Sequence, residues 1–342
     1  MKKMIALLLT LLLVFSCVPM AFAANGSLLN KDDCSYGAYK HVFILGVDGA
    51  GQYFKDADTP NFDRIFKDGA VKYDARAEVY TDSAPNWGSI LTGVSNLRNM
   101  YTNGNVSPEG DDPPKIQHMR KYPTIYKRIR CAMPDAVLAS FGNWSVINYG
   151  IVEDDLGVYK HNDPTDEEVA NSIVNYLDEG NKPTLLFTQF DSVDHAGHTY
   201  GSDSELYFNQ IHVVDEYLGQ IYDAIIRNGL LDDSLIIVTP DHGHKAEGGH
   251  GRFSMRESLV TVAVAGKTVK KGGKMDFDTR HRDIAAITLF ALGIPKPLDI
   301  TARVPANLFN GYIGEVRPIH RDILDAIISS VMWIYTLSTK DE

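Results

Sequence analysis

The chain has 342 residues, a formal net charge of −11 and three cysteines. The acidic balance argues against a broad nucleic-acid-binding surface, because contact with a phosphate backbone needs clustered lysine and arginine. Three cysteines are too few for a disulfide scaffold, and none has the CxxC spacing of a thiolate metal site.

The N-terminus has the pattern of a targeting segment. Lys2 and Lys3 precede an apolar stretch over residues 4–18, and Ala21-Phe22-Ala23 supplies the small-x-small pattern that signal peptidase recognises. We therefore predict a signal peptide at 1–23 and a secreted or otherwise extracytoplasmic protein. The residues ending in Cys17 resemble a lipoprotein box, but the bulky Phe15 fits it poorly, so lipid anchoring at Cys17 is the less favoured alternative.

Beyond the leader, no stretch reaches the roughly 18 to 20 uninterrupted apolar residues needed to cross a bilayer, so we expect no transmembrane anchor. The nearest, residues 323–337, is expected to be an amphipathic helix docked on the domain. After leader cleavage Cys34 and Cys131 remain, and the sequence does not decide whether they pair.

Short apolar runs alternate along the chain with segments of helical periodicity. The runs that predict strands cover 41–47, 136–141, 184–190, 235–238 and 259–265. The helical patterns cover 59–69, 87–91, 122–133, 166–177, 205–228 and 283–292. This alternation predicts an α/β fold with a doubly wound, mostly parallel sheet and helices on both faces. We expect one domain over 24–342, with loop insertions near 94–118 and 150–166.

Metal-ligand side chains follow three of the predicted strands. Asp48 follows the first, the segment 191–198 with Asp194 and His198 follows another, and Asp241, His242 and His250 follow a third. Ligands of open parallel sheets gather at the carboxyl ends of strands, so these side chains are expected to meet at one rim. Carboxylate and imidazole together suit zinc or a similar divalent ion. A histidine-rich surface loop is the plainer alternative for the stretch around His242.

In this order along the chain, the motifs resemble those of the alkaline phosphatase superfamily, and within it the nucleotide pyrophosphatase/phosphodiesterase branch. The matching segments are Gly46-Val47-Asp48-Gly49, Ser83-Ala84-Pro85-Asn86, Asp194-His195-Ala196-Gly197-His198, Asp241-His242-Gly243 and Gly249-His250-Gly251. The resemblance implies an alkaline phosphatase-like fold and a metal-dependent hydrolase of phosphate esters.

The resemblance also implies a ligand set for two divalent ions, expected to be Zn²⁺. One ion would be held by Asp194, His198 and His250, and the other by Asp48, Asp241, His242 and the oxygen of Ser83. Coordination would activate Ser83 as a nucleophile that forms a phosphoseryl intermediate. The Asn86 amide, three residues on, is expected to bind a non-bridging phosphate oxygen.

Several alternatives remain open at this stage. The phosphodiesterase branch usually has threonine where this chain has Ser83, so a phosphomonoesterase is the alternative to hydrolysis of diester or pyrophosphate bonds. A sulfatase would need arginine where Trp87 stands, and a phosphoglycerate mutase would need a large inserted domain. A non-catalytic, metal-stabilised binding protein would have no need of Ser83. The expected partner is a small phosphate ester, nucleotide-like or another diester.

Other residues near the motifs are interpreted as structural. Asp191 either orients a ligand histidine or caps its loop. His195 and His244 are interpreted as loop surface or hydrogen-bonded structure, because the implied ligand set is complete without them. Trp87 and Trp144 are expected in the core or at the rim rather than stacked on a substrate ring.

Overall fold

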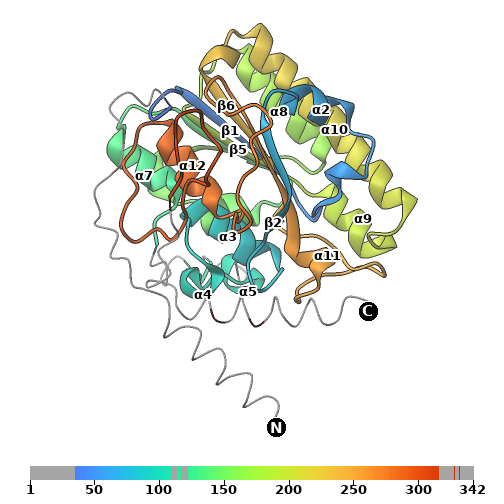
Figure 1. Ribbon diagram of the computed structural model, residues 1–342. Coiled ribbons are helices and arrows are strands. Elements are labelled where there is room, and N and C mark those ends of the chain that lie inside the picture. The colour runs from blue at the N-terminus through green and yellow to red at the C-terminus, as the bar shows by residue number, and fades with distance from the viewer. Residues whose placement is uncertain (1–34, 109–113, 117–121, 316–326, 328–330, 332–342) are drawn as a thin grey trace. The chain divides into compact units, whose positions relative to one another are not determined.

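The computed structural model describes residues 35–108, 114–116, 122–315, 327 and 331 (Figure 1). The predicted signal peptide and Cys34 lie outside these residues, as does nearly all of the predicted helix at 323–337. Among the residues described, no helix is both long enough and apolar enough to span a membrane.

A single seven-stranded sheet forms the centre of the molecule, in the order β2-β7-β6-β1-β5-β3-β4. The strands are β1 His41–Val47, β2 Ala70–Arg76, β3 Leu138–Gly142, β4 Tyr159–Asn162, β5 Leu185–Phe190, β6 Ser234–Thr239 and β7 Leu259–Ala265. The central pairs are parallel, and β7 alone runs against its neighbours β2 and β6. The predicted mostly parallel sheet is confirmed.

Both faces of the sheet are buried under helices, because alternate residues of each strand point to opposite sides. In β1, Val42 and Ile44 belong to one apolar cluster and Phe43, Leu45 and Val47 to the other. The first cluster includes residues of α3 Ser83–Thr92, α7 Ile125–Ala132 and α12 Asp283–Ala291. The second includes residues of α2 Pro60–Phe66, α8 Asp166–Asp178 and α10 Glu205–Arg227 (Figure 1). The doubly wound arrangement is therefore confirmed.

The remaining helices are short. The α-helices are α4 Asn96–Asn99, α5 Asn103–Val106, α9 Ser192–Tyr200 and α11 Met255–Ser258. The others are the 3₁₀ turns η1 Tyr53–Lys55, η3 Asp154–Leu156 and η4 Leu231–Asp233 and the π-turn η2 Ile147–Ile151.

Both predicted loop insertions contain regular structure. The segment near 94–118 includes α4 and α5, and its Val106 and Ile116 are fully buried in the core. The segment near 150–166 includes β4, an edge strand whose sequence Tyr-Lys-His-Asn gives no apolar pattern. The edge strand β2, interrupted by Lys72 and Asp74, also escaped prediction.

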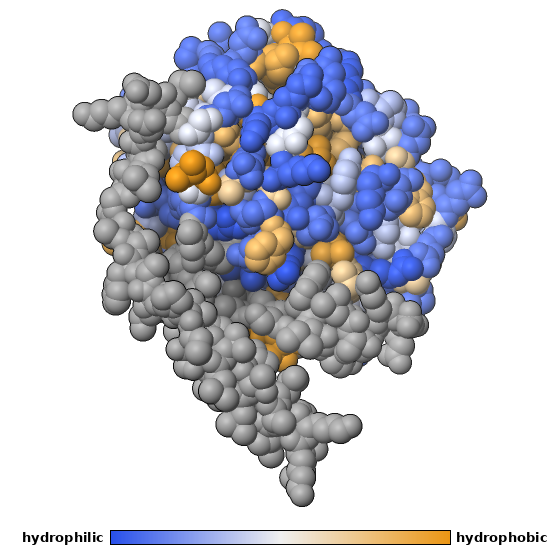
Figure 2. All heavy atoms as spheres, in the orientation of Figure 1, coloured by the Kyte–Doolittle hydropathy of each residue, from blue (hydrophilic) through white to orange (hydrophobic). Residues whose placement is uncertain are grey.

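The sheet order explains why distant motifs meet. Strands β6, β1 and β5 are adjacent and parallel, with Gly46 opposite Thr239 and Val47 opposite Phe190. Asp48 and Asp241 therefore leave neighbouring strands at the same edge of the sheet, and α9 begins just beyond the end of β5. The face of the molecule seen in Figure 2 is mainly hydrophilic, with apolar side chains scattered in small groups.

Candidate metal centre and nucleophile

Ser83 is the first residue of α3, which begins four residues before the predicted start at Trp87. Pro85 does not prevent this, because a proline in the first helical turn removes only an amide that has no partner within the helix. Ser83 is 8% exposed, and its Oγ lies 3.2 Å from His242 Nε2. The N-terminus of a helix favours anions, so the hydroxyl stands where a phosphate group would be stabilised.

Asp48, Asp241 and His242 form a buried cluster beside this hydroxyl. His242 Nε2 lies 3.5 Å from Asp48 Oδ1 and 3.3 Å from Asp241 Oδ2. These two carboxylate oxygens are buried and have no hydrogen-bond partner among the described residues. The other oxygens are occupied, since Asp241 Oδ1 accepts from Gly49 N at 3.1 Å. Buried oxygens without donors, aimed at one imidazole nitrogen, are the arrangement that a cation would satisfy.

The pKa values of the two carboxylates in this cluster also favour a bound cation. Burial, and then the nearby charges of Asp241 and Asp194, raise the pKa of Asp48 well above its usual value. Burial likewise raises the pKa of Asp241. Two adjacent buried carboxylates must be neutralised either by protons or by a cation between them.

A second cluster surrounds Asp194, which lies on α9 rather than in the loop predicted there. Residues four apart share one face of a helix, so α9 presents Asp194 and His198 together. His198 Nε2 lies 3.4 Å from Asp194 Oδ2 and 3.0 Å from His250 Nε2. His250 Nε2 is 3.5 Å from Asp194 Oδ1. The three predicted ligands of this group therefore lie together at the rim.

His242, which is fully buried, and His250, which is partly buried, are oriented by backbone carbonyl oxygens. His250 Nδ1 lies 2.7 Å from the carbonyl oxygen of Thr81, and His242 Nδ1 lies 3.2 Å from that of Gly243. A carbonyl can only accept, so each Nδ1 carries the proton and each Nε2 keeps a lone pair. Burial, and then neighbouring imidazoles, lower the pKa of His242, and burial also lowers the pKa of His250.

The spacing of these atoms fits metal coordination. In a tetrahedral zinc site with bonds of about 2.0–2.1 Å, neighbouring ligand atoms are separated by about 3.3 Å. The distances within both clusters are close to this separation. Each cluster mixes carboxylate and imidazole, the donor types that suit a divalent ion such as zinc.

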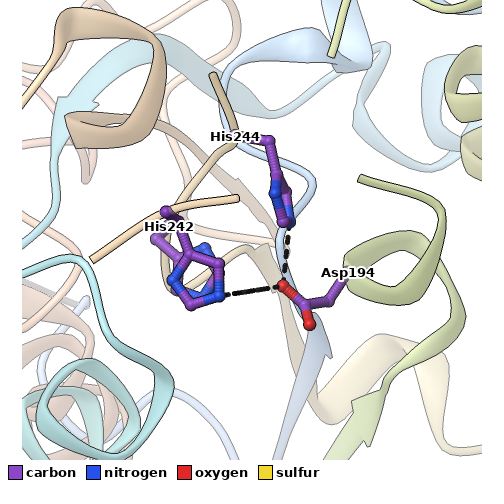
Figure 3. A group of neighbouring side chains, drawn as sticks. Asp194, His242 and His244 are labelled. Atoms are coloured by element: carbon purple, nitrogen blue, oxygen red, sulfur yellow. Dashed lines mark hydrogen bonds and ion pairs between the residues drawn. The ribbon is translucent and has the colours of Figure 1, made fainter. Parts of the chain in front are cut away.

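His244 was interpreted from the sequence as loop surface or hydrogen-bonded structure, and the second of these alternatives describes it. It is fully buried, and its Nε2 lies 2.8 Å from Asp194 Oδ1. Figure 3 shows Asp194 directed from α9 toward both His242 and His244. The donor atoms that all lie within 4.8 Å of one another belong to Asp194, His242, His244 and His250, so this tightest group contains His244 in place of the more exposed His198.

Asn86 does not have the surroundings predicted for it. Its side chain is fully buried, and Nδ2 donates to the carbonyl oxygens of Tyr80 and Asp82, each at 2.7 Å. Its Oδ1 accepts from Glu78 N and lies 2.7 Å from His281 Nε2. With both amide hydrogens committed to the backbone, Asn86 shapes the loop before Ser83 instead of facing a phosphate oxygen.

A different asparagine reaches the start of α3. Asn103, the first residue of α5, is exposed, and its Oδ1 accepts from Ala84 N at 2.9 Å. No motif identified it, because it lies in a segment that was predicted to be an irregular loop. The contact arises because α5 packs against α3.

Further hydrogen bonds connect Asp48 to Trp87 and Gln189, and Gln189 to Asp191. Asp48 Oδ2 accepts from Trp87 Nε1 at 2.9 Å and from Gln189 Nε2 at 3.0 Å. The same Gln189 Nε2 donates to Asp191 Oδ1 at 2.8 Å. Burial raises the pKa of Asp191 to about 6. Trp87 is fully buried, as predicted for a core residue.

Comparison with known families agrees with this geometry. Residues 42–288 match the family described as type I phosphodiesterase / nucleotide pyrophosphatase. The chain belongs to this family. The match covers all seven strands except His41, the first residue of β1, and it contains all the predicted metal ligands. It places the chain in the phosphodiesterase branch of the alkaline phosphatase superfamily, as the motifs implied.

Among curated relatives, the human GPI ethanolamine phosphate transferase 2 catalytic subunit is 29% identical over 39% of this chain and 14% of its own length. The human bis(5'-adenosyl)-triphosphatase ENPP4 is 22% identical over 62% of this chain and 49% of its own. Human ectonucleotide pyrophosphatase/phosphodiesterase family member 7 is 25% identical over 61% and 49%. The chain thus spans half or less of the length of these relatives.

Solved structures share the fold of this family member at low sequence identity. Murine ectonucleotide pyrophosphatase / phosphodiesterase 5 aligns with a TM-score of 0.61 and 16% identity, over 75% of this chain and 96% of that one. A putative sulfatase from Bacteroides fragilis aligns with a TM-score of 0.54 and 13% identity, over 78% and 77%. Both likenesses establish the architecture alone.

Proposed function

We propose that this protein hydrolyses phosphate esters, with phosphodiester or pyrophosphate bonds preferred to monoesters, and that Ser83 is the nucleophile. The observation that carries the proposal is the position of Ser83 Oγ, at the N-terminus of α3 and 3.2 Å from His242 Nε2. This hydroxyl lies beside two buried carboxylate oxygens that have no donor among the described residues.

We infer that the two clusters hold two divalent ions, expected to be Zn²⁺. Asp48, Asp241 and His242, with the Ser83 oxygen, would hold one ion, and Asp194, His198 and His250 would hold the other. Bound ions of this kind lower the pKa of an attacking hydroxyl and neutralise charge on a phosphoryl group. The residues themselves fix the ligand atoms in place, since carbonyl oxygens orient both His242 and His250.

The reaction at Ser83 has two stages. In the first, Ser83 Oγ forms a bond to phosphorus while the bond from phosphorus to the leaving-group oxygen breaks. In the second, water attacks the phosphoserine, which releases the phosphoryl product and restores the hydroxyl. Splitting the displacement in this way is characteristic of nucleophilic catalysis by serine.

We infer that the phosphoryl oxygens are stabilised by the first turn of α3 and by Asn103. The Asn103 Oδ1 is fixed by Ala84 N, the amide next to Ser83, so its NH₂ group is held near the start of the same helix. Oriented donors at the site where charge develops are among the strongest contributions to catalysis. Asn86 contributes by holding the backbone of residues 80–82 in position.

The proposed preference for diesters is supported by the ion pairing of Arg282. A phosphomonoester carries an additional negative charge, so a monoesterase would benefit from a cation beside the nucleophile. Arg282 forms an ion pair with Glu78 in which both side chains are fully buried, and the backbone amide of Glu78 donates to Asn86 Oδ1. Its charge is already neutralised, and this favours the diester.

The substrate is proposed to be a small nucleotide-like or other phosphodiester, met outside the cytoplasm if the predicted signal peptide is used. In support, an inactive variant of murine ectonucleotide pyrophosphatase / phosphodiesterase 5 has been solved in complex with AMP. That structure aligns with this chain at a TM-score of 0.62.

The test compares initial rates on bis-p-nitrophenyl phosphate and p-nitrophenyl phosphate, with added zinc and after chelation. We expect the diester rate to exceed the monoester rate and to require metal. Ser83→Ala and Asp241→Ala should each abolish it. The reverse preference would favour a phosphomonoesterase, and metal binding without turnover of either ester would favour a binding protein.

A further inference from the structure

His244 occupies a place between the segments that carry the candidate ligands. It follows β6 two residues after His242, and its ring is fully buried. Its Nε2 lies 2.8 Å from Asp194 Oδ1, while its Nδ1 has no partner among the described residues. A buried histidine with a single strong contact requires an explanation, because burial of an imidazole without compensation is unfavourable.

Two glycines on different segments make room for this ring. An alanine Cβ at Gly197, in the middle of α9, would lie 2.3 Å from His244 Cδ2. A Cβ at Gly49, just after β1, would lie 2.8 Å from His244 Nε2. Both distances are far below van der Waals contact. The ring therefore fills a slot whose walls are the backbone beside Asp48 and the backbone between Asp194 and His198.

We propose that His244 is a positioning residue that fixes Asp194 and sets the spacing between the two ligand clusters. The inference rests on the proposed metal site. His244 Nε2 donates to Asp194 Oδ1, and Asp194 Oδ2 lies 3.4 Å from His198 Nε2. By holding Oδ1, which also lies 3.5 Å from His250 Nε2, the imidazole fixes the carboxylate so that Oδ2 faces His198.

The contact also joins three elements that bear ligands. Asp48 leaves β1, Asp194 and His198 belong to α9, and His242 belongs to the loop after β6. His244 touches the first two through Gly49 and Gly197 and is part of the third. A rigid side chain in this position holds the two clusters at a fixed separation. Such a separation is required if two bound ions are to assist an in-line displacement at phosphorus.

The first test measures zinc binding by the purified full chain, without any substrate. We expect His244→Ala to weaken zinc affinity by about 10–100-fold, the usual effect of losing a group that orients a ligand. His244→Gln keeps a donor for Asp194 and should recover part of that loss. His212→Ala is the matched control, because His212 is partly exposed on α10 and contacts Asp58, and it should bind zinc as the natural chain does.

The second test is a double-mutant cycle between Gly197 and His244. Gly197→Ala should weaken zinc binding because its methyl group displaces the ring. In the His244→Ala background the slot is empty, so the same methyl group should cause little further loss. Alanine is itself favoured over glycine inside a helix, so the single variant should still fold, which circular dichroism checks.

The outcomes separate this inference from the proposed function. Zinc affinity unchanged in His244→Ala, or additive losses in the cycle, would overturn the role of His244 while leaving the hydrolase proposal intact. Failure of the natural chain to bind zinc would overturn the metal site and this inference together. A hydrolytic rate of zero with the predicted coupling in zinc binding would contradict only the proposed function.

Discussion

At the scale of single residues, two asparagines near Ser83 are used in different ways. The Asn86 side chain makes four hydrogen bonds inside the protein and is fully buried, whereas the Asn103 side chain makes one to the helix start and remains exposed. The first therefore stabilises the loop before Ser83, and the second is available to a substrate.

This difference gives opposite expectations for two alanine substitutions. Asn103→Ala should lower kcat/KM for the diester by about 100-fold or more with little change in stability, as loss of an oriented donor does. Asn86→Ala should cost about 3 kcal/mol of unfolding free energy, because several buried partners lose their bonds. Urea denaturation and steady-state kinetics on both variants check the pair. A stable but inactive Asn86→Ala would return the phosphate-binding role to Asn86.

The burial of His281 leads to a separate prediction about how stability depends on pH. Burial, and then the charges of Arg282 and Arg280, lower the pKa of His281 to about 3. The unfolded chain has the ordinary value near 6.5, so between these values it binds more protons than the folded chain. Stability is therefore retained above about pH 6.5 and lost as pH falls toward 3. At pH 4.5 this one group has lowered the unfolding free energy by about 3 kcal/mol relative to its value above pH 6.5.

The measurement is unfolding free energy against pH for the natural chain and His281→Gln. Glutamine keeps a donor for Asn86 Oδ1 but does not titrate, so the variant should lose less stability between pH 6.5 and 4.5. Parallel curves for the two proteins would contradict this role for His281.

The sequence predicted the position of the candidate ligand residues better than that of their neighbours. Asp48, Asp241 and His242 directly follow predicted strands, so strand prediction alone brings them to one rim. His244 differs from its neighbours only in the slot formed by Gly49 and Gly197, and three-dimensional packing creates that slot. A single sequence gives no signal for such a contact between segments that are far apart.

At the scale of elements, α2 shows how a helix can be capped from another part of the chain. Its N-cap residue Thr59 makes no side-chain capping bond. Instead, Asp215 of α10 accepts from the backbone amides of Asn61 at 2.8 Å and Phe62 at 2.7 Å. A carboxylate at this position accepts hydrogen bonds from two amides of the first turn and interacts favourably with the helix dipole.

Asp215→Ala should therefore destabilise the protein by about 2 kcal/mol, the combined effect of a lost cap and two unpaired amides. Asp223→Ala is the matched control on the same helix, because it removes only an exposed ion pair with Arg64. That change should cost less than about 1 kcal/mol. Thermal unfolding of both variants decides between them, and equal losses would contradict a capping role.

Element prediction succeeded where apolar periodicity was strong and failed where it was weak. Strands β1, β5 and β6 are buried along nearly their whole length and were predicted within one residue or so. The edge strand β4 contains no aliphatic residue, and α9 carries a run of candidate ligand residues whose sequence resembles a loop. Local patterns record burial, so elements exposed at an edge or specialised for a site are the ones they miss.

At the scale of the whole molecule, negative charge opposes the binding of an anionic substrate. The chain carries a net charge of −11, and its candidate site brings three of its carboxylates, those of Asp48, Asp194 and Asp241, together around His242. An anionic phosphate ester would be repelled from such a rim. Cations bound between the carboxylates would reverse the local potential whatever the overall balance.

We therefore propose that two metal ions occupy this rim, and a crystal structure of the zinc-loaded protein is the decisive test. We predict two anomalous difference peaks at the zinc edge. One should be bounded by Asp194, His198 and His250, and the other by Asp48, Asp241 and His242 beside Ser83 Oγ. A map with no peak between these side chains, or with a single peak remote from Ser83, would contradict it.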